Sequence, residues 1–193
     1  MMTEYFDLPI LRWIATHLHS PLGDKLMPAI TFLGDAGWIW ILLALMLLCI
    51  PQYRKTGLTM ATALLMGLVV CNLILKPLVG RMRPFDYELL HFGRVIPLLI
   101  EAPTDFSFPS GHTIASVEAT AVLLLHDKRI GIPASILACL IAFSRLYLYV
   151  HYPTDVLTSV VLGIGIACLA NSFINKGYPL LINYFKRKKE KLS

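Results

Sequence analysis

The sequence predicts an all-α membrane protein, a bundle of about five to six transmembrane or interfacial helices. Of its 193 residues, 56% are hydrophobic and only 15% are charged, whereas soluble domains carry about 25% charged residues. The apolar residues gather in five runs long enough to suit helices that cross a bilayer. No internal repeat divides the chain. We therefore expect residues 1–193 to form one membrane-embedded domain.

The first 20 residues contain an amphipathic segment. Apolar residues between Tyr5 and Leu18 alternate with charged ones such as Asp7 and Arg12. The segment is too short and too polar to cross a membrane. It predicts an interfacial helix within residues 1–20.

Hydropathy places the membrane spans at about residues 26–50, 56–75, 112–125, 130–149 and 155–173. The first span is imperfect, because a Gly-Asp-Ala-Gly sequence interrupts its early part. Between the second and third spans lies a long polar stretch that we expect to be irregular. After the fifth span, a short apolar segment is expected to lie on the surface.

The distribution of Lys and Arg predicts the orientation of the bundle. Basic pairs occur at residues 54–55 and 128–129, and a basic tail covers residues 186–193. With five spans these three places share one face, which the positive-inside rule assigns to the cytoplasm. The segment 80–110 and the turn around His151 then lie on the extracytoplasmic face.

Composition argues against several other classes of protein. The net charge of +5 comes largely from the basic tail, which suits anionic lipid headgroups and not nucleic acid. The four cysteines lie inside apolar runs without metal-ligand spacing, so we expect them to act as small hydrophobic residues: Cys49, Cys71, Cys139 and Cys168. We expect neither a metal site nor a cofactor.

Polar residues near the predicted extracytoplasmic face form three groups. The groups are Lys76 with Arg83-Pro84, then Pro109-Ser110-Gly111-His112, then Ser144-Arg145 with His151 and Asp155. Each group alone has an ordinary explanation: basic side chains that reach for the membrane surface, a helix cap, or interfacial polar residues. Their occurrence together, in order and on one face, favours a functional site.

The residue types in these groups suit an anion. Lys76, Arg83 and Arg145 come from separate segments and can converge on one phosphate, since Arg binds two phosphate oxygens at once. Ser110 and Gly111 stand at a helix start, where free N–H groups also bind anions.

The histidines of the site suit proton transfer and nucleophilic attack. His151 lies within reach of Asp155, and such a carboxylate fixes the imidazole tautomer and supports positive charge on the ring. His112 is then free to protonate a leaving oxygen.

These groups match the three-part signature of the type 2 phosphatidic acid phosphatase family, also called lipid phosphate phosphatases. The match runs from Lys76 to Asp155, and every signature position holds the family residue. The resemblance implies a membrane bundle, usually of six helices, with its site near the outer face. It also implies hydrolysis of a phosphomonoester or pyrophosphate without a metal.

The resemblance also assigns roles to the residues. His151 is expected to attack phosphorus and form a phosphohistidine, Asp155 to support it, and His112 to protonate the leaving group and then activate water. The residues expected to hold the phosphoryl oxygens are Lys76, Arg83, Ser110, Gly111 and Arg145.

Several hypotheses about substrate and reaction remain open from the sequence. Family substrates include undecaprenyl pyrophosphate, which we favour, phosphatidylglycerol phosphate, phosphatidic acid and lipid A phosphates. A phosphotransferase would pass the phosphoryl group to a lipid acceptor instead of water. A transporter or scaffold would use the charges to line a path. The expected partners are the lipid phosphate and membrane lipids, and the oligomeric state is open.

Three features outside the signature carry weaker hypotheses. Asp35 is either a helix-start residue or a carboxylate that contacts the catalytic cations. Glu118 lies in a predicted span and should be paired, protonated or facing a polar interior. The segment 85–108 connects two phosphate-binding groups, and we expect it to govern which lipid is accepted.

Overall fold

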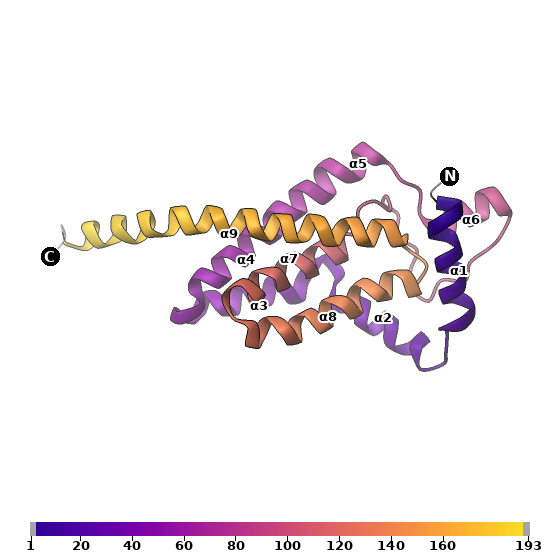
Figure 1. Cartoon of the computed structure of the whole chain (residues 1–193), viewed down its shortest axis with the longest axis horizontal. Helices are drawn as coiled ribbons and strands as arrows, with labels where there is room; N and C mark the ends of the chain where they lie inside the picture. Colours follow the sequence, from indigo (N-terminus) through magenta and orange to yellow (C-terminus); the bar gives the residue numbers. More distant parts are fainter. Residues whose placement is uncertain (1–2, 191–193) are drawn as a thin grey trace.

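In the computed structural model, which describes residues 3–190 and the side chains of residues 3–178, every regular element is a helix. In chain order the elements are η1 (Thr3–Asp7), α1 (Leu8–His17), α2 (Gly23–Leu33), η2 (Asp35–Gly37), α3 (Trp38–Cys49), η3 (Pro51–Tyr53), α4 (Arg54–Leu68), η4 (Val69–Leu75), α5 (Lys76–Val79), α6 (Pro84–Phe92), α7 (Gly111–His126), α8 (Lys128–Tyr147) and α9 (Pro153–Glu190). Figure 1 shows the long helices forming a bundle, with α1 and α6 at one end. The predicted all-α fold is confirmed.

Helix α7 lies at the centre of the bundle, in contact with α4, α8 and α9. Its residues Ala119, Val122 and Leu123 are fully buried. Small residues on the neighbouring helices allow close approach: a Cβ atom on Gly163 would lie only 2.9 Å from Cβ of Val117. Membrane helices associate through such close packing, because lipid supplies little hydrophobic drive between them. This packing fixes the position of the α7 N-terminus, where the Ser-Gly-His group lies.

Several helices are long and apolar enough to cross a membrane. Among the described residues three stretches meet that criterion, and a fourth is added if the bent pair α2 and α3 is one span. Helix α7, with 16 residues, is shorter than a span normally is, but it runs through the centre of the bundle. By this criterion three or four crossings are found, and the predicted number of five is reached only if α7 is counted as well.

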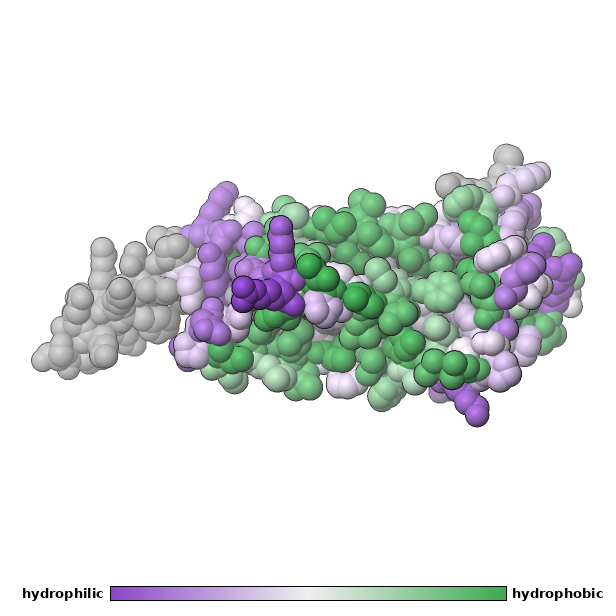
Figure 2. All heavy atoms as spheres, turned by 60° about the horizontal axis from the view of Figure 1, so that its bottom comes forward, coloured by the Kyte–Doolittle hydropathy of each residue, from purple (hydrophilic) through white to green (hydrophobic). Residues whose placement is uncertain are grey.

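The outside of the bundle is suited to lipid. Figure 2 shows a hydrophobic band between two hydrophilic ends. Large apolar side chains point outward along this band, including Leu45, Leu65, Ile136 and Val161, of which Val161 is 71% exposed. Exposed apolar surface on this scale is unfavourable in water. The chain is therefore a multi-pass membrane protein.

The turns of the bundle separate into two ends. Tyr53 Oη in η3 donates a hydrogen bond to Asp127 Oδ2, 3.2 Å away, so the α3–α4 and α7–α8 turns are neighbours. Figure 1 shows these two turns at the end away from α1 and α6. The basic pairs at 54–55 and 128–129 therefore share one end, as the sequence predicted. The side chains of the basic tail, residues 186–193, lie outside the described residues.

Helix α1 is fixed to the other end of the bundle. Its apolar face contacts Tyr149 and Tyr152 through Leu8 and Leu11. Arg12 Nε and Nη2 donate to the carboxylate of Glu88 in α6 at 2.7 Å and 3.0 Å. The N-terminal segment predicted to be helical is confirmed as a helix, and it packs over the same end as the polar groups.

Three predicted elements differ in the structure. The span 26–50 is divided into α2 and α3, which meet at an angle of 42°, because Ala36 and Gly37 have left-handed φ values of 49° and 68°. The segment 178–185, predicted to be separate, continues α9. The stretch 80–110 contains helix α6, which begins with a proline and ends at a left-handed glycine.

Candidate active site

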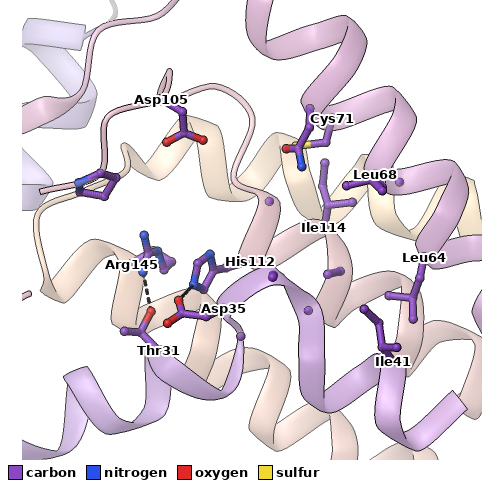
Figure 3. A pocket seen from close by; sticks show the side chains of 18 of the residues that line it. Thr31, Asp35, Ile41, Leu64, Leu68, Cys71, Asp105, His112, Ile114 and Arg145 are labelled. Atoms are coloured by element: carbon purple, nitrogen blue, oxygen red, sulfur yellow. Dashed lines mark hydrogen bonds and ion pairs between the residues drawn. The ribbon is translucent and has the colours of Figure 1, made fainter. Parts of the chain in front are cut away.

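A cavity of about 750 Å³ opens between α2, α3, α4 and the N-terminus of α7. Figure 3 shows its two parts: Asp35, Asp105, His112 and Arg145 gather at one end, and Leu64 lies at the other. The polar end is also lined by Lys76, Arg83 and His151, and the apolar end by Ile41, Leu45, Leu65, Leu68 and Ile114. The cavity thus joins a charged chamber to an apolar groove, which fits an amphipathic ligand with an anionic headgroup.

Two of the predicted cations are held together by a loop carboxylate. Asp105 forms ion pairs with Lys76 Nζ and with Arg83 Nη2. Arg83 Nε also donates to the backbone oxygen of Asp105 at 2.8 Å. Partial burial would raise the pKa of the Asp105 carboxyl, but hydrogen bonds from Lys76 and Arg83 outweigh burial and lower it to about 2. A carboxylate therefore stands where a phosphate could accept from the same donors.

The third cation, Arg145, is buried in α8 with incomplete hydrogen bonding. Its Nη1 donates to Thr31 Oγ1 at 2.5 Å, and Figure 3 shows this bond from α2. Its Nε is buried without a hydrogen-bond partner among the described residues. A buried donor without an acceptor is costly. Since Arg145 lines the cavity, an anion bound there would supply the missing acceptor.

His151 lies in the short loop between α8 and α9, with 2% of its surface exposed. Its Nε2 is 3.4 Å from Arg83 Nη1, and the ring lines the cavity. Burial and the positive charges of Arg145 and Arg83 lower the pKa of His151 well below its ordinary value. The ring is therefore neutral near pH 7, with Nε2 able to act as a lone-pair donor.

Asp155 approaches His151 but is bonded mainly to other groups. Its Oδ2 is 3.6 Å from His151 Nδ1, which is longer than a hydrogen bond. The same oxygen accepts from Ser107 Oγ at 2.6 Å and from the Tyr152 amide at 3.0 Å. Asp155 also forms an ion pair with Arg81. The predicted pair is close in space, and the carboxylate is rigidly held beside the ring.

Arg81 connects Asp155 to the N-terminal segment. Its Nη2 donates to Asp7 Oδ2 at 2.7 Å, and Asp7 Oδ1 accepts from the Thr154 amide at 2.9 Å. The Arg81 guanidinium also lies 3.8 Å above the ring centroid of Tyr152. The sequence gives no sign of this network, because no local pattern links residues so far apart in the chain.

His112 lies in the first turn of α7 and lines the cavity. Its Nε2 is 2.8 Å from Oδ1 of Asp35. Asp35 belongs to the break between α2 and α3, and Figure 3 shows its carboxylate directed at the ring. The recorded partner of Asp35 is therefore a histidine of the site, and not one of the catalytic cations that the sequence-based hypothesis named.

Ser110 and Gly111 differ in their placement. Ser110 is fully buried and caps α7, since its Oγ accepts from Thr113 N at 3.4 Å and from Thr113 Oγ1 at 3.0 Å. Its own amide donates to Ser159 Oγ at 2.9 Å. Gly111 lines the cavity, whereas Ser110 does not.

Glu118 lines the apolar part of the cavity against Gly67, and its Oε2 has no partner among the described residues.

Comparison with known proteins identifies the family. The sequence model of the PAP2 superfamily matches residues 52–178 of this chain. An undecaprenyl-diphosphatase of Sulfolobus acidocaldarius is 34% identical over 72% of this chain and 66% of its own length. The phosphatidylglycerophosphatase B of Bacillus subtilis is 30% identical over 90% of this chain and 84% of its own length.

A solved structure supports the same assignment. The crystal structure of Aquifex aeolicus LpxE superposes with a TM-score of 0.73 at 27% identity, over 88% of this chain and 98% of that one. The shared fold, the membrane-facing surface and the family match agree with the resemblance inferred from the motifs. The chain belongs to the PAP2 superfamily, as an integral membrane lipid phosphatase.

Proposed function

We propose that the protein removes the terminal phosphate of a lipid diphosphate through a phosphohistidine on His151, without a metal. The observation that carries this proposal is the buried ring of His151, which lines the cavity together with Lys76, Arg83 and Arg145. A neutral imidazole is a nucleophile, and three cations around it stabilise the charge of a transferring phosphoryl group.

The proposed first step is attack by His151 Nε2 on the terminal phosphorus. A P–N bond forms as the bond from the terminal phosphorus to the bridging oxygen breaks, and His112 gives its proton to that oxygen of the departing lipid monophosphate. Asp155 lies beside Nδ1 and stabilises the positive charge that the ring acquires. In the second step His112 removes a proton from water, the water attacks phosphorus, and the P–N bond breaks. Inorganic phosphate leaves and His151 is restored.

Substrate binding must displace the carboxylate of Asp105. Lys76 and Arg83 already donate to it, and a phosphate needs the same donors. The phosphate also offers an acceptor to Arg145 Nε, which has none among the described residues. The exchange is favourable because a phosphate carries more charge and more acceptor oxygens than one carboxylate.

Undecaprenyl diphosphate is the substrate we favour. The undecaprenyl-diphosphatase of Sulfolobus acidocaldarius is 34% identical, against 30% for the phosphatidylglycerophosphatase. The groove beyond the charged chamber is lined by Leu64, Leu65 and Leu68, which suits an apolar tail. Ile100, Glu101 and Pro103 of the α6–α7 connection also line the cavity, and we propose that this segment contributes to the choice of lipid.

A substrate panel tests this proposal. Purified protein in detergent, with EDTA present, would be given undecaprenyl diphosphate, phosphatidylglycerophosphate, phosphatidic acid and lipid A, with the His151→Ala variant as control. We expect kcat/KM to be highest for undecaprenyl diphosphate by at least about tenfold, a difference of about 1.4 kcal/mol. A higher kcat/KM for another lipid would identify that lipid as the preferred substrate. Transfer of labelled phosphate to a lipid acceptor would identify a phosphotransferase.

We further propose that the site faces away from the cytoplasm. The basic pairs at 54–55 and 128–129 lie at the opposite end of the bundle, which the positive-inside rule makes cytoplasmic. In a variant without the native cysteines, a membrane-impermeant thiol reagent applied to intact cells should label Phe92→Cys and leave Arg129→Cys unlabelled. The reverse pattern would invert the topology.

A further inference from the structure

The break between α2 and α3 brings two residues against the ring of His112. Asp35 Oδ1 lies 2.8 Å from His112 Nε2. Gly34 lies so close to the ring that a Cβ atom there would be 2.8 Å from His112 Cδ2. Only a residue without a side chain allows this approach. The ring is therefore packed on one side by the backbone of the break and bonded at its edge by a carboxylate.

The backbone of the break is unusual in a way that a passive connection does not require. Ala36 has φ of 49°, a left-handed value that residues other than glycine adopt rarely. Gly37 follows with φ of 68°. Such conformations cost energy and tend to persist where they serve a site. Asp35, which directly precedes these two residues, lines the cavity together with them.

Among the described residues, the recorded hydrogen bond of the Asp35 side chain is the one to His112. The carboxylate is 53% exposed, so the packing of the core does not depend on it. Its described contact is with His112, across a separation of 77 residues.

We infer that Asp35 is a positioning residue for His112: by accepting from Nε2–H it fixes the ring so that Nδ1 is the nitrogen that exchanges protons with substrate and water. The inference rests on the proposed role of His112 as the acid that protonates the leaving group. A neutral imidazole has one N–H and one lone pair, and the partner of one nitrogen decides the state of the other. The negative charge of Asp35 also favours the protonated ring that is needed when the leaving group departs.

This role makes a prediction that a merely structural role does not. Protonation matters greatly when an alkoxide leaves and little when a stable phenolate leaves. Two phosphomonoesters with the same apolar tail isolate this difference: decyl phosphate and 4-decyl-2-nitrophenyl phosphate. The constant kcat/KM depends on the steps up to and including departure of the leaving group. It is therefore sensitive to protonation of the leaving oxygen and not to the later hydrolysis of the phosphohistidine.

For Asp35→Ala we expect kcat/KM on decyl phosphate to fall by about 10- to 100-fold, as loss of such supporting partners does elsewhere. On the nitrophenyl ester the same variant should lose less than about threefold, because no proton is needed. His112→Ala should show the same pattern with a larger loss on decyl phosphate. Asp35→Asn, which keeps the size but not the charge, should also affect decyl phosphate more than the nitrophenyl ester.

Thr31→Val provides the matched control. Thr31 lies in α2 just before the same break, but it contacts Arg145 and not His112. Since Arg145 is proposed to bind phosphate, this variant should lower kcat/KM on both esters by the same factor. Activity on the nitrophenyl ester shows in every case that the variant is folded.

Two results would overturn the inference. One is an equal loss on both esters in Asp35→Ala, which would mean that Asp35 supports phosphate binding or folding. The other is full activity of Asp35→Ala on decyl phosphate. Failure of the proposed function would appear differently. The wild type would be active, but His112→Ala would lose kcat/KM by the same factor on both esters.

Discussion

The two ends of helix α7 each carry a histidine in a different setting. His126, at its C-terminus, is bonded on both sides: Nδ1 lies 3.0 Å from Thr56 Oγ1 and Nε2 lies 3.0 Å from Asn171 Oδ1. Both partners are neutral, and His126 does not line the described cavity. His112, at the N-terminus, is bonded to a carboxylate and borders a cavity with three cations. The same residue type on the same helix is structural at one end and placed for chemistry at the other.

The difference lies in how completely the polar groups are satisfied. At the His126 end, Asp127 accepts from Tyr53 and from the Arg129 amide. At the His112 end, Arg145 Nε is left without a partner among the described residues, and Lys76 shares one carboxylate with Arg83. A buried cation with incomplete hydrogen bonding therefore occurs at the His112 end, whereas the basic residues 54–55 and 128–129 near the His126 end are exposed or half-buried. An anion bound in the cavity would complete the hydrogen bonding of Arg145.

The largest effect should separate the nucleophile from the structural histidine. We expect His151→Ala to lower kcat by at least about 1,000-fold, because removal of a nucleophile abolishes the covalent route. His126→Ala should keep kcat within about threefold and lower the melting temperature, since two partly buried hydrogen bonds are lost at about 1 kcal/mol each. Steady-state kinetics and thermal unfolding in detergent measure both. Comparable loss of kcat in the two variants would remove the contrast between the ends.

The next effect concerns the arginine whose hydrogen bonding is incomplete. Arg145→Lys should lower kcat/KM by about 10- to 100-fold, because lysine cannot present the planar fork that binds two oxygens. The same substitution at Arg129, near the opposite end of α8, should change kcat/KM by less than about twofold, as surface substitutions usually do. Equal behaviour of the two variants would show that Arg145 does not bind the substrate.

A smaller effect is expected from the carboxylate that occupies the cation site. In Asp105→Asn, vanadate should inhibit about three- to tenfold more strongly, because Lys76 and Arg83 are released for the anion that mimics the transition state. Asp127→Asn, at the His126 end of α7, should leave the inhibition constant for vanadate unchanged. Weaker inhibition in Asp105→Asn would mean that Asp105 holds the cations in place for the substrate.

The pH dependence of this competition follows from the low pKa of Asp105, about 2. Its ordinary value is higher, so the folded protein favours the ionised form. Any stability that its ion pairs provide is present above pH 4 or so and is lost only as the pH falls toward about 2. Between about pH 5.5 and 8 the carboxylate stays ionised. The ratio of inhibition constants for wild type and Asp105→Asn should therefore be constant across that range.

The smallest effect should come from removing divalent metals. The charge that a metal would supply is already provided by Lys76, Arg83 and Arg145, so EDTA should change kcat by less than about twofold. Within residues 3–178, whose side chains the structure describes, no three His, Cys, Asp or Glu side chains are grouped so that they could hold a metal ion. Inactivation by EDTA that is reversed by magnesium would show that the charge balance at the site is incomplete without a metal.

Some features of the molecule could be predicted from local sequence. Helices α7, α8 and α9 follow from apolar runs, and the residues of the three polar groups carry the resemblance to the family. Helix α6 could also have been predicted, because Pro84 marks its start and Gly93 its end. Hydropathy alone missed it, since a short polar helix produces no apolar run.

Other features depend on contacts that no local pattern reveals. The pair of Asp35 and His112 joins residues 77 positions apart, and Arg81 reaches Asp7 over 74 positions. The sequence shows an interruption at residues 34–37 but not what it faces. The role of Asp105 was also missed, because its significance comes from the two cations that the fold brings to it.

The most direct test of the account is to trap the covalent intermediate. In His112→Ala, 4-decyl-2-nitrophenyl phosphate labelled in its phosphate should still phosphorylate His151, because its leaving group needs no proton. Hydrolysis of the phosphohistidine should be slow, because His112 is no longer present as the base that activates water. Rapid quenching and mass spectrometry should then find an acid-labile, base-stable phosphate on His151, approaching one per molecule. Label on another residue, or continued turnover of wild type and variant with no labelled protein at any time, would contradict the central claim.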